Sequence, residues 1–330
     1  MSFRMLAVTC LFITTNALAA AGAGEIKIGF VLSTLQEERY LKDQKYFQEE
    51  AKRLGFTPVM ASAENNPQTQ AAKVENLLSQ GVKAIVIQPV NSQAAANLVK
   101  LAHAEKVPVI AYDRLIADAP VDAYVTQDSF QVGVLQGEAA AKATGGKGNY
   151  VLLKGAAGHS VANEITRGVM SVLAKHKDIK VVVEKSHENW SPALAMATVE
   201  NALTQYANKI DAVIANNSGM AQGAVQALAG QGLAGKVFVA GADADLAAIK
   251  SIWAGRQAFE VLKDIRPLAE TSAQVAWKLA KGETLTGTKQ KNGAYEIITI
   301  ATPVYAIDKS NLEARIFKTG FHDRKAVVGN

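Results

Sequence analysis

The 330-residue sequence lacks several features that would place it in a specialised class of protein. It has one cysteine, Cys10, and contains no stretch of 18 consecutive apolar residues and no run of five like charges. Such a chain has no disulfide framework and no membrane-spanning helix. Basic residues slightly outnumber acidic ones, but they are scattered singly along the chain and do not indicate a nucleic-acid partner. Hydrophobic residues make up 49% and charged residues 20%, which excludes a disordered, collagen-like or coiled-coil chain. A length of 330 residues favours two globular domains that need no covalent staple.

Motifs for catalysis and for cofactors are also missing. The sequence has no G-x-S-x-G, no G-x-x-x-x-G-K-[ST] and no G-x-G-x-x-G opening a helix after its first strand. Its five histidines, at 103, 159, 176, 187 and 322, show no metal-binding spacing. We therefore predict no catalytic residue, no metal site and no cofactor, and expect a protein that binds its ligand unchanged.

The N-terminus has the pattern of an export signal. Arg4 is followed by an apolar run over residues 5–13 and by Ala17-Leu18-Ala19, whose small residues suit signal peptidase. We expect a signal peptide over residues 1–19, removed to leave a soluble protein in the periplasm that begins near Ala20. Thr9 before Cys10 is a poor residue for lipoprotein processing, so lipid anchoring is not expected.

Apolar strands alternate with helices along the remainder of the chain. Strands are predicted at 26–32, 58–61, 84–88, 108–112, 123–126, 149–153, 180–184, 212–215, 237–240, 257–262 and 295–299. Helical segments separate most of them, and many end at glycines such as Gly55 and Gly81. Continuously apolar strands in such an alternation are typical of parallel sheets covered on both faces. The fold class is therefore α/β, with two similar doubly wound lobes.

In a doubly wound sheet, ligands bind beyond the carboxyl ends of the strands. The loops predicted there are rich in hydrogen-bonding side chains, among them Asp113-Arg114 in the first lobe and Asn216-Asn217-Ser218 in the second. Asn, Asp and Arg offer paired donors and acceptors that match vicinal hydroxyls, and Trp190 offers an apolar ring face to sugar C–H groups. This chemistry suits a neutral polyol.

Each of these residues also has a purely structural interpretation. Asp113 is a common turn starter, Asn217 lies where a helix cap is expected, and Trp190 precedes a helix that it could staple. Asp245 is expected to be a helix N-cap outside the site, and Trp253 is expected to pack in the core.

Five segments carry a resemblance to a known family. They are 35–43 (LQEERYLKD), 111–116 (AYDRLI), 208–215 (NKIDAVIA), 241–250 (GADADLAAIK) and 319–322 (TGFH). With the order of elements and the export signal, they make the chain similar to the periplasmic D-xylose-binding proteins of bacterial ABC importers, within the type I sugar-binding proteins related to ribose- and galactose-binding proteins. The resemblance extends from about residue 25 to 322.

The resemblance implies a ligand site without catalysis. The implied ligand-binding residues are Arg39, Tyr40, Asp113, Arg114, Asn163, Trp190, Asn217, Asp243 and Lys263. Three departures leave the sugar open: Asn217-Ser218 replaces Asn-Asp, the loop 155–163 looks more like the ribose-binding version, and Tyr40 stands in place of tryptophan. D-xylose is the first expectation, and another aldose, a cyclic polyol or a modified sugar remains an alternative.

The resemblance also implies three crossings between the lobes, expected near 126–128, 262–264 and 292–302. The N-terminal lobe is then 25–126 plus 264–292, and the C-terminal lobe is 127–263 plus 302–330, with a three-segment hinge that closes around the sugar. The expected partners are a monosaccharide and an inner-membrane permease, with a monomeric protein and no nucleic acid.

Three competing functions follow from the same residues. A chemoreceptor-coupled sensor would use the same binding event, and a sugar-responsive repressor would need an N-terminal helix-turn-helix. A carbohydrate-active enzyme would use Asp113, Asp243 and Glu188 as acids and bases.

Overall fold

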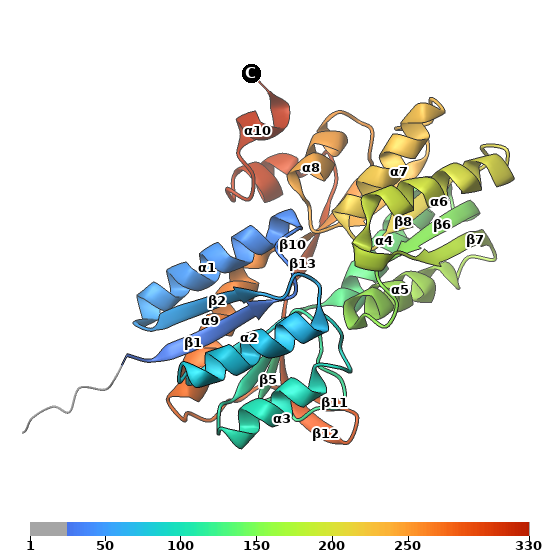
Figure 1. Cartoon of the computed structure of the whole chain (residues 1–330). Coiled ribbons are helices and arrows are strands. Elements are labelled where there is room, and N and C mark those ends of the chain that lie inside the picture. Colours follow the sequence, from blue (N-terminus) through green and yellow to red (C-terminus); the bar gives the residue numbers. More distant parts are fainter. Residues whose placement is uncertain (1–24, 330) are drawn as a thin grey trace, which may run out of the picture.

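The computed structural model describes residues 25–329, so the expected signal peptide, Cys10 and the cleavage position lie outside the described residues. Figure 1 shows two α/β lobes beside each other, each with helices packed on a central sheet. The predicted fold class is confirmed by this architecture. None of the helices within 25–329 is both long and apolar enough to cross a membrane.

The first lobe contains a seven-stranded sheet in the order β11-β12-β5-β4-β3-β1-β2. All neighbouring strands run parallel except β11 and β12, which form an antiparallel pair. Its strands are β1 (Lys27–Leu32), β2 (Thr57–Ser62), β3 (Ala84–Ile87), β4 (Val109–Tyr112), β5 (Ala123–Gln127), β11 (Thr288–Asn292) and β12 (Tyr295–Thr302). Its helices are α1 (Glu38–Leu54), α2 (Pro67–Ser79), α3 (Ala96–Ala104) and α9 (Ile265–Ala280).

The second lobe contains a six-stranded sheet in the order β13-β10-β9-β8-β6-β7, parallel except for the pair β10 and β13. Its strands are β6 (Lys147–Lys154), β7 (Asp178–Ser186), β8 (Ala212–Ala215), β9 (Phe238–Ala242), β10 (Phe259–Lys263) and β13 (Val304–Ile307). Its helices are α4 (Ser129–Thr144), α5 (Ser160–Leu173), α6 (Pro192–Gln205), α7 (Ser218–Gly230), α8 (Leu246–Trp253) and α10 (Arg324–Val328), with short helical turns at Glu188–Trp190 and Glu313–Phe317.

Local sequence explains where these elements form. The central strands β3 (AIVI) and β8 (AVIA) are buried along their whole length, as expected for parallel strands covered on both faces. The side chains of Asn66 and Ser191 cap α2 and α6, and each helix then has proline in its first turn. Gly133 and Gly168 allow α4 and α5 to touch, because a Cβ on Gly133 would lie 1.9 Å from the Ile165 carbonyl oxygen.

Two hydrophobic clusters sandwich the first sheet. One joins α1 and α9 to Phe30 and Tyr112, and the other joins α2 and α3 to Ile85 and Ile87 on the opposite face. Burial of these apolar side chains on both faces, at about 25 cal/mol per Å², stabilises the sheet. The sheet is therefore a rigid base for the loops at its carboxyl edge.

The chain passes three times between the lobes. It leaves β5 for α4, leaves β10 for α9, and leaves β12 for β13. The last passage differs from the expected 292–302: β12 stays in the first sheet up to Thr302, paired with β5, so residues 293–301 belong to the first lobe. Each sheet also gains an antiparallel edge pair from the C-terminal part of the chain, β11 with β12 in the first lobe and β10 with β13 in the second.

Candidate functional site

A cavity lies where the carboxyl ends of the strands of both lobes meet. The free space inside it is about 20 Å³, room for about one water molecule, so the side chains of the two lobes lie close around it. The first lobe contributes residues after β1 and β4. The second contributes residues after β7, β8 and β9, Lys263 at the end of β10, and one residue from α5. The lining residues are Glu37, Arg39, Tyr40, Asp113, Arg114, Val161, Trp190, Asn216, Asp243 and Lys263.

The two cavity aspartates occupy equivalent places in the two lobes. Asp113 follows β4 with φ 61°, and Asp243 follows β9 with φ 98°. The Asp113 N–H donates to the Val125 carbonyl at 2.8 Å, and the Asp243 N–H donates to the Val261 carbonyl at 2.9 Å. Such left-handed backbone is strained for a residue with a Cβ, and strain of this kind clusters at ligand sites. Each strand end therefore holds one carboxylate at the cavity.

Two cations connect these carboxylates across the lobes. Arg39 Nη1 lies 3.4 Å from Asp113 Oδ1 and 3.7 Å from Asp243 Oδ1. Lys263 Nζ lies 3.2 Å from Asp243 Oδ1 and 3.8 Å from Asp113 Oδ1. Burial raises the pKa of Asp113, but Arg39, Lys263 and Arg114 outweigh it and hold that pKa below its ordinary value. Asp113 is thus an ionised hydrogen-bond acceptor.

Further contacts fix the first-lobe side chains. Arg39 Nε lies 3.4 Å from Asp43 Oδ2, and Gln88 Nε2 donates to Asp113 Oδ2 at 2.9 Å. Arg114 Nη2 donates to the Tyr40 hydroxyl at 2.8 Å, and burial raises the pKa of Tyr40, which keeps it a neutral phenol. Of the charged side chains that line the cavity, three are cations (Arg39, Arg114, Lys263) and three carry carboxyl groups (Glu37, Asp113, Asp243), so their charges balance when all are ionised. The arrangement favours an uncharged ligand with both donors and acceptors.

Trp190 forms the apolar part of the wall. It has φ 54° and is 9% exposed, and its ring packs on Gly155, where an added Cβ would lie 2.4 Å from Trp190 Cζ2. The His159 ring meets it edge-on at 5.3 Å. Burial, together with Arg114, holds the pKa of His159 well below its ordinary value, so this histidine is neutral. The indole is held in place by its neighbours.

Several buried polar atoms at this cavity have no hydrogen-bond partner within residues 25–329. They include Arg39 Nη2, Asp243 Oδ1 and Trp190 Nε1, although Asp243 Oδ1 is ion-paired with Lys263. Buried polar groups are nearly always partnered, because leaving one unpaired costs about 1–3 kcal/mol. A ligand that supplies hydroxyls would satisfy these atoms.

The structure brings seven of the nine predicted site residues to this cavity: Arg39, Tyr40, Asp113, Arg114, Trp190, Asp243 and Lys263. Asn163 is exposed and lies instead in a separate pocket beside Ser160 and Glu164. Asn217 caps α7, because its Oδ1 accepts from the Met220 N–H at 2.9 Å, and its neighbour Asn216 lines the cavity in its place. The interpretation of Asn217 as a helix cap is therefore confirmed. Neither Asn163 nor Asn217, both predicted to bind ligand, lines the cavity.

Other sequence predictions are settled by burial. Glu188, a suggested acid of the enzyme alternative, is exposed and does not line the cavity, whereas Glu37 lines it and was not predicted. Trp253 packs beside Phe317, as predicted, with ring centroids 6.4 Å apart. Asp245 occupies the N-cap position of α8, but its side chain makes no capping hydrogen bond, so the predicted capping role is wrong. Across 25–329, no group of three His, Cys, Asp or Glu side chains is placed to hold a metal ion.

Comparison with known proteins gives a consistent result. Residues 28–284 match the model of the periplasmic binding protein domain family. The chain is 42% identical to the D-xylose-binding periplasmic protein of Escherichia coli over 92% of this chain and 93% of that protein. It is 36% identical to the protein of the same name in Haemophilus influenzae, over 94% of each.

A solved structure agrees in its fold. The ABC-transporter solute-binding protein of Bacillus halodurans, with bound myo-inositol, has a TM-score of 0.80, 30% identity, and coverage of 89% of this chain and 98% of that chain. These relatives are solute-binding proteins rather than enzymes. With a family match over most of its length and two closely similar relatives, the chain belongs to the periplasmic binding protein family.

Proposed function

We propose that this protein captures a neutral monosaccharide, D-xylose first, in the cavity between its lobes and delivers it to the permease of an ABC importer. The observation that carries the proposal is the charge-balanced cavity, which combines unpartnered donors and acceptors with one apolar ring. The carboxyl oxygens of Asp113 and Asp243 accept hydrogen bonds from sugar hydroxyls. Arg39, Arg114 and Lys263 donate to hydroxyl and ring oxygens, and Trp190 packs against a C–H face.

The relatives support the choice of sugar and also define its alternative. Two of them are named for D-xylose, whereas the Bacillus halodurans protein holds myo-inositol. D-xylose and myo-inositol are both small rings with equatorial hydroxyls. The same carboxylates and cations of the cavity can bind either of them. Another aldose or a cyclic polyol is therefore the second candidate ligand.

Hydrolysis of a glycosidic bond is poorly supported by the geometry. A glycoside hydrolase needs one carboxylic acid that is protonated when the bond breaks. The pKa of Asp113 is held below its ordinary value, and Asp243 is paired with Lys263 at 3.2 Å. We therefore expect the sugar to leave unchanged.

Export, partner and oligomeric state belong to the same proposal. The relatives are periplasmic proteins, and we propose export with removal of residues 1–19 and action as a monomer. The three inter-lobe passages would form the hinge, and the closed form would present both lobes to the permease. A chemoreceptor that reads the same closed form is a further partner consistent with this arrangement.

Calorimetric titration of the purified protein tests the ligand. The panel is D-xylose, D-ribose, D-glucose, D-allose, myo-inositol and, as a charged control, a sugar acid. We expect the tightest binding from D-xylose, no product by chromatography, and stabilisation of about 2.7 kcal/mol at a hundredfold excess over Kd. Preference for myo-inositol would select the second candidate. Binding of none of the neutral sugars, or of the sugar acid alone, would overturn the proposal.

A further inference from the structure

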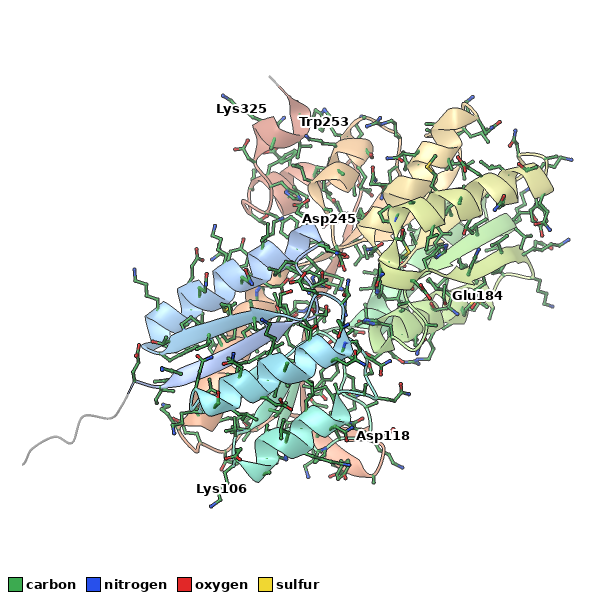
Figure 2. The ribbon with its side chains drawn as sticks, in the orientation of Figure 1. Lys106, Asp118, Glu184, Asp245, Trp253 and Lys325 are labelled. Atoms are coloured by element: carbon green, nitrogen blue, oxygen red, sulfur yellow. The ribbon has the colours of Figure 1, made fainter. Side chains whose placement is uncertain are left out.

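Helix α8 receives its N-terminal cap from the other lobe. Asp245 precedes the helix but makes no capping hydrogen bond. Instead, the Leu246 N–H donates to Glu38 Oε2 at 3.0 Å, and Glu38 is the first residue of α1 in the first lobe. Figure 2 shows Asp245 directly beside the start of α1, where the two lobes approach each other. A hydrogen bond between residues 208 positions apart thus completes this helix.

The C-terminal residues Phe321 and His322 lie beside the same contact between the lobes. Glu38 Oε1 lies 3.3 Å from Lys42 Nζ, and Lys42 lies 4.1 Å from the centroid of the Phe321 ring. His322 Nε2 is hydrogen-bonded to the Ala244 carbonyl at 2.7 Å, next to the cavity residue Asp243. The loop that carries Asp243 is therefore tied on one side to the tail and, through Leu246, to the first lobe.

We propose that Glu38 is a positioning residue that holds the closed form by capping α8 across the lobes. Glu38 does not line the cavity, so this role needs no contact with sugar. Its carboxylate lies at the positive end of the α8 dipole, where a negative charge stabilises a helix. Opening of the lobes would break the hydrogen bond and leave the Leu246 N–H to water. This inference rests on the proposed function, because it assigns to Glu38 a share of the sugar affinity that closure supplies.

Two substitutions of Glu38 separate the hydrogen bond from the charge. Glu38→Ala removes the acceptor, whereas Glu38→Gln keeps an acceptor oxygen and loses the charge. With the sugar that the parent protein binds, we expect Glu38→Ala to weaken affinity about three- to tenfold, mainly through faster dissociation. Glu38→Gln should restore part of that loss. Glu49→Ala on the same helix is the matched control, because Glu49 contacts Lys45 and Arg266 within the first lobe, and it should bind as the parent does.

Leu246→Pro removes the donor while keeping a residue suited to the first position of a helix. Asp245 has φ −57° and ψ 154°, an extended conformation that a following proline accepts. We expect Leu246→Pro to accelerate dissociation, and we expect no further acceleration when Glu38→Ala is added. Such non-additivity in a double-mutant cycle identifies the pair as one contact.

A ligand-independent measurement distinguishes failure of this inference from failure of the proposed function. Residues 25–329 contain no cysteine, so Lys106→Cys and Glu184→Cys, on different lobes in Figure 2, can carry a fluorescent donor and acceptor. Glu38→Ala should lower the closed fraction with and without sugar. If no sugar binds the parent protein, the proposed function fails, and an unchanged closed fraction then rejects the cap as well. If sugar binds and Glu38→Ala matches the parent in dissociation rate, only the cap is rejected.

Discussion

At the scale of single residues, the site depends on opposite charges that are buried together. Asp113 faces Arg39 at 3.4 Å and Lys263 at 3.8 Å, and the side chains of all three are about 5% exposed. Removing one member of such a group leaves its partners buried without compensation. Under the proposed function, the effect of a substitution therefore combines the loss of a contact to sugar with the cost of leaving the remaining charges unpaired.

Replacement of Asp113 by Ala should weaken sugar binding by about 1.5–3 kcal/mol, the range for a hydrogen bond to a charged group. The fold should persist, because the strand β4 that carries Asp113 is buried by apolar side chains. Calorimetric titration and a melting curve measure the two effects. Asp245→Ala is the control: with no capping bond to lose, it should leave the melting temperature of the sugar-free protein close to that of the parent. Parent-like affinity in Asp113→Ala would show that Asp113 does not meet the sugar.

Residue types and strand ends brought forward Asp113, Arg114 and Trp190, and the family resemblance supplied the full set of expected site residues, including Lys263. Asp113, Asp243 and Lys263 directly follow or end strands that the sequence makes plain. Glu37 lies in the same polar loop as Arg39 and Tyr40, but the family resemblance implied only the latter two as ligand-binding residues, so Glu37 was missed. Glu37 is half-buried at the cavity beside residues of the second lobe, a contact that no local sequence pattern records. Burial raises its pKa, opposed by Arg114.

At the scale of elements, a glycine sets the position of the Trp190 ring in the cavity wall. Gly155 follows β6, and the Trp190 indole fills the space where a side chain would stand. The contact joins the end of β6 to the turn after β7. A substitution of Gly155 therefore alters the cavity by displacing the Trp190 ring, without removing any polar group.

Gly155→Ala should displace the Trp190 ring and weaken sugar binding about three- to tenfold, because a well-placed aromatic contact is worth about 0.5–1.5 kcal/mol. Titration gives the affinity, and sugar-induced change in tryptophan fluorescence reports the ring itself. Gly230→Ala, a helical position in the same lobe with open space around it, should keep the parent affinity. Equal affinities for the two variants would mean that Trp190 does not contribute to binding.

The elements themselves were predictable where apolar runs are long, and not where pairing partners decide. Strands β3, β8 and β10 follow from their own sequences. Strand β11 (TKQKN) is almost wholly exposed and polar, and it becomes a strand only because it pairs with β12. Strand β13 (VYAI) comes one residue after β12, so a single extended stretch conceals the change of sheet at Pro303.

At the scale of the whole molecule, closure changes the solvent around titratable groups. His159 is buried between Trp190 and the first lobe, and burial, with Arg114, holds its pKa well below its ordinary value near 6.5. A group with a lowered pKa in the closed form binds protons better in the open form. Below a pH of about 6.5, His159 is protonated in the open form, so closure must remove that proton.

His159 should therefore contribute a loss of sugar affinity as the pH falls from 7 to 5, so at pH 5 His159→Gln should have lost less affinity, or gained more, than the parent protein. Titrations of both proteins at each pH give the comparison. The difference between them isolates His159 from Asp245 and Glu37, whose pKa values are raised by burial and which act in the opposite direction. Parallel pH profiles for the two proteins would rule out this role of His159.

The interleaved passages also have a consequence for the order in which the protein acquires its structure. The first sheet contains β12, which pairs with β5 although about 170 residues separate them, and the second sheet contains β13, which lies later still. Neither sheet can be completed by a growing chain until residues near 307 have left the ribosome. Pairings so distant in sequence form slowly because closing long loops costs entropy. A chain whose sheets cannot form until it is almost fully synthesised can still be unfolded when it is exported across a membrane.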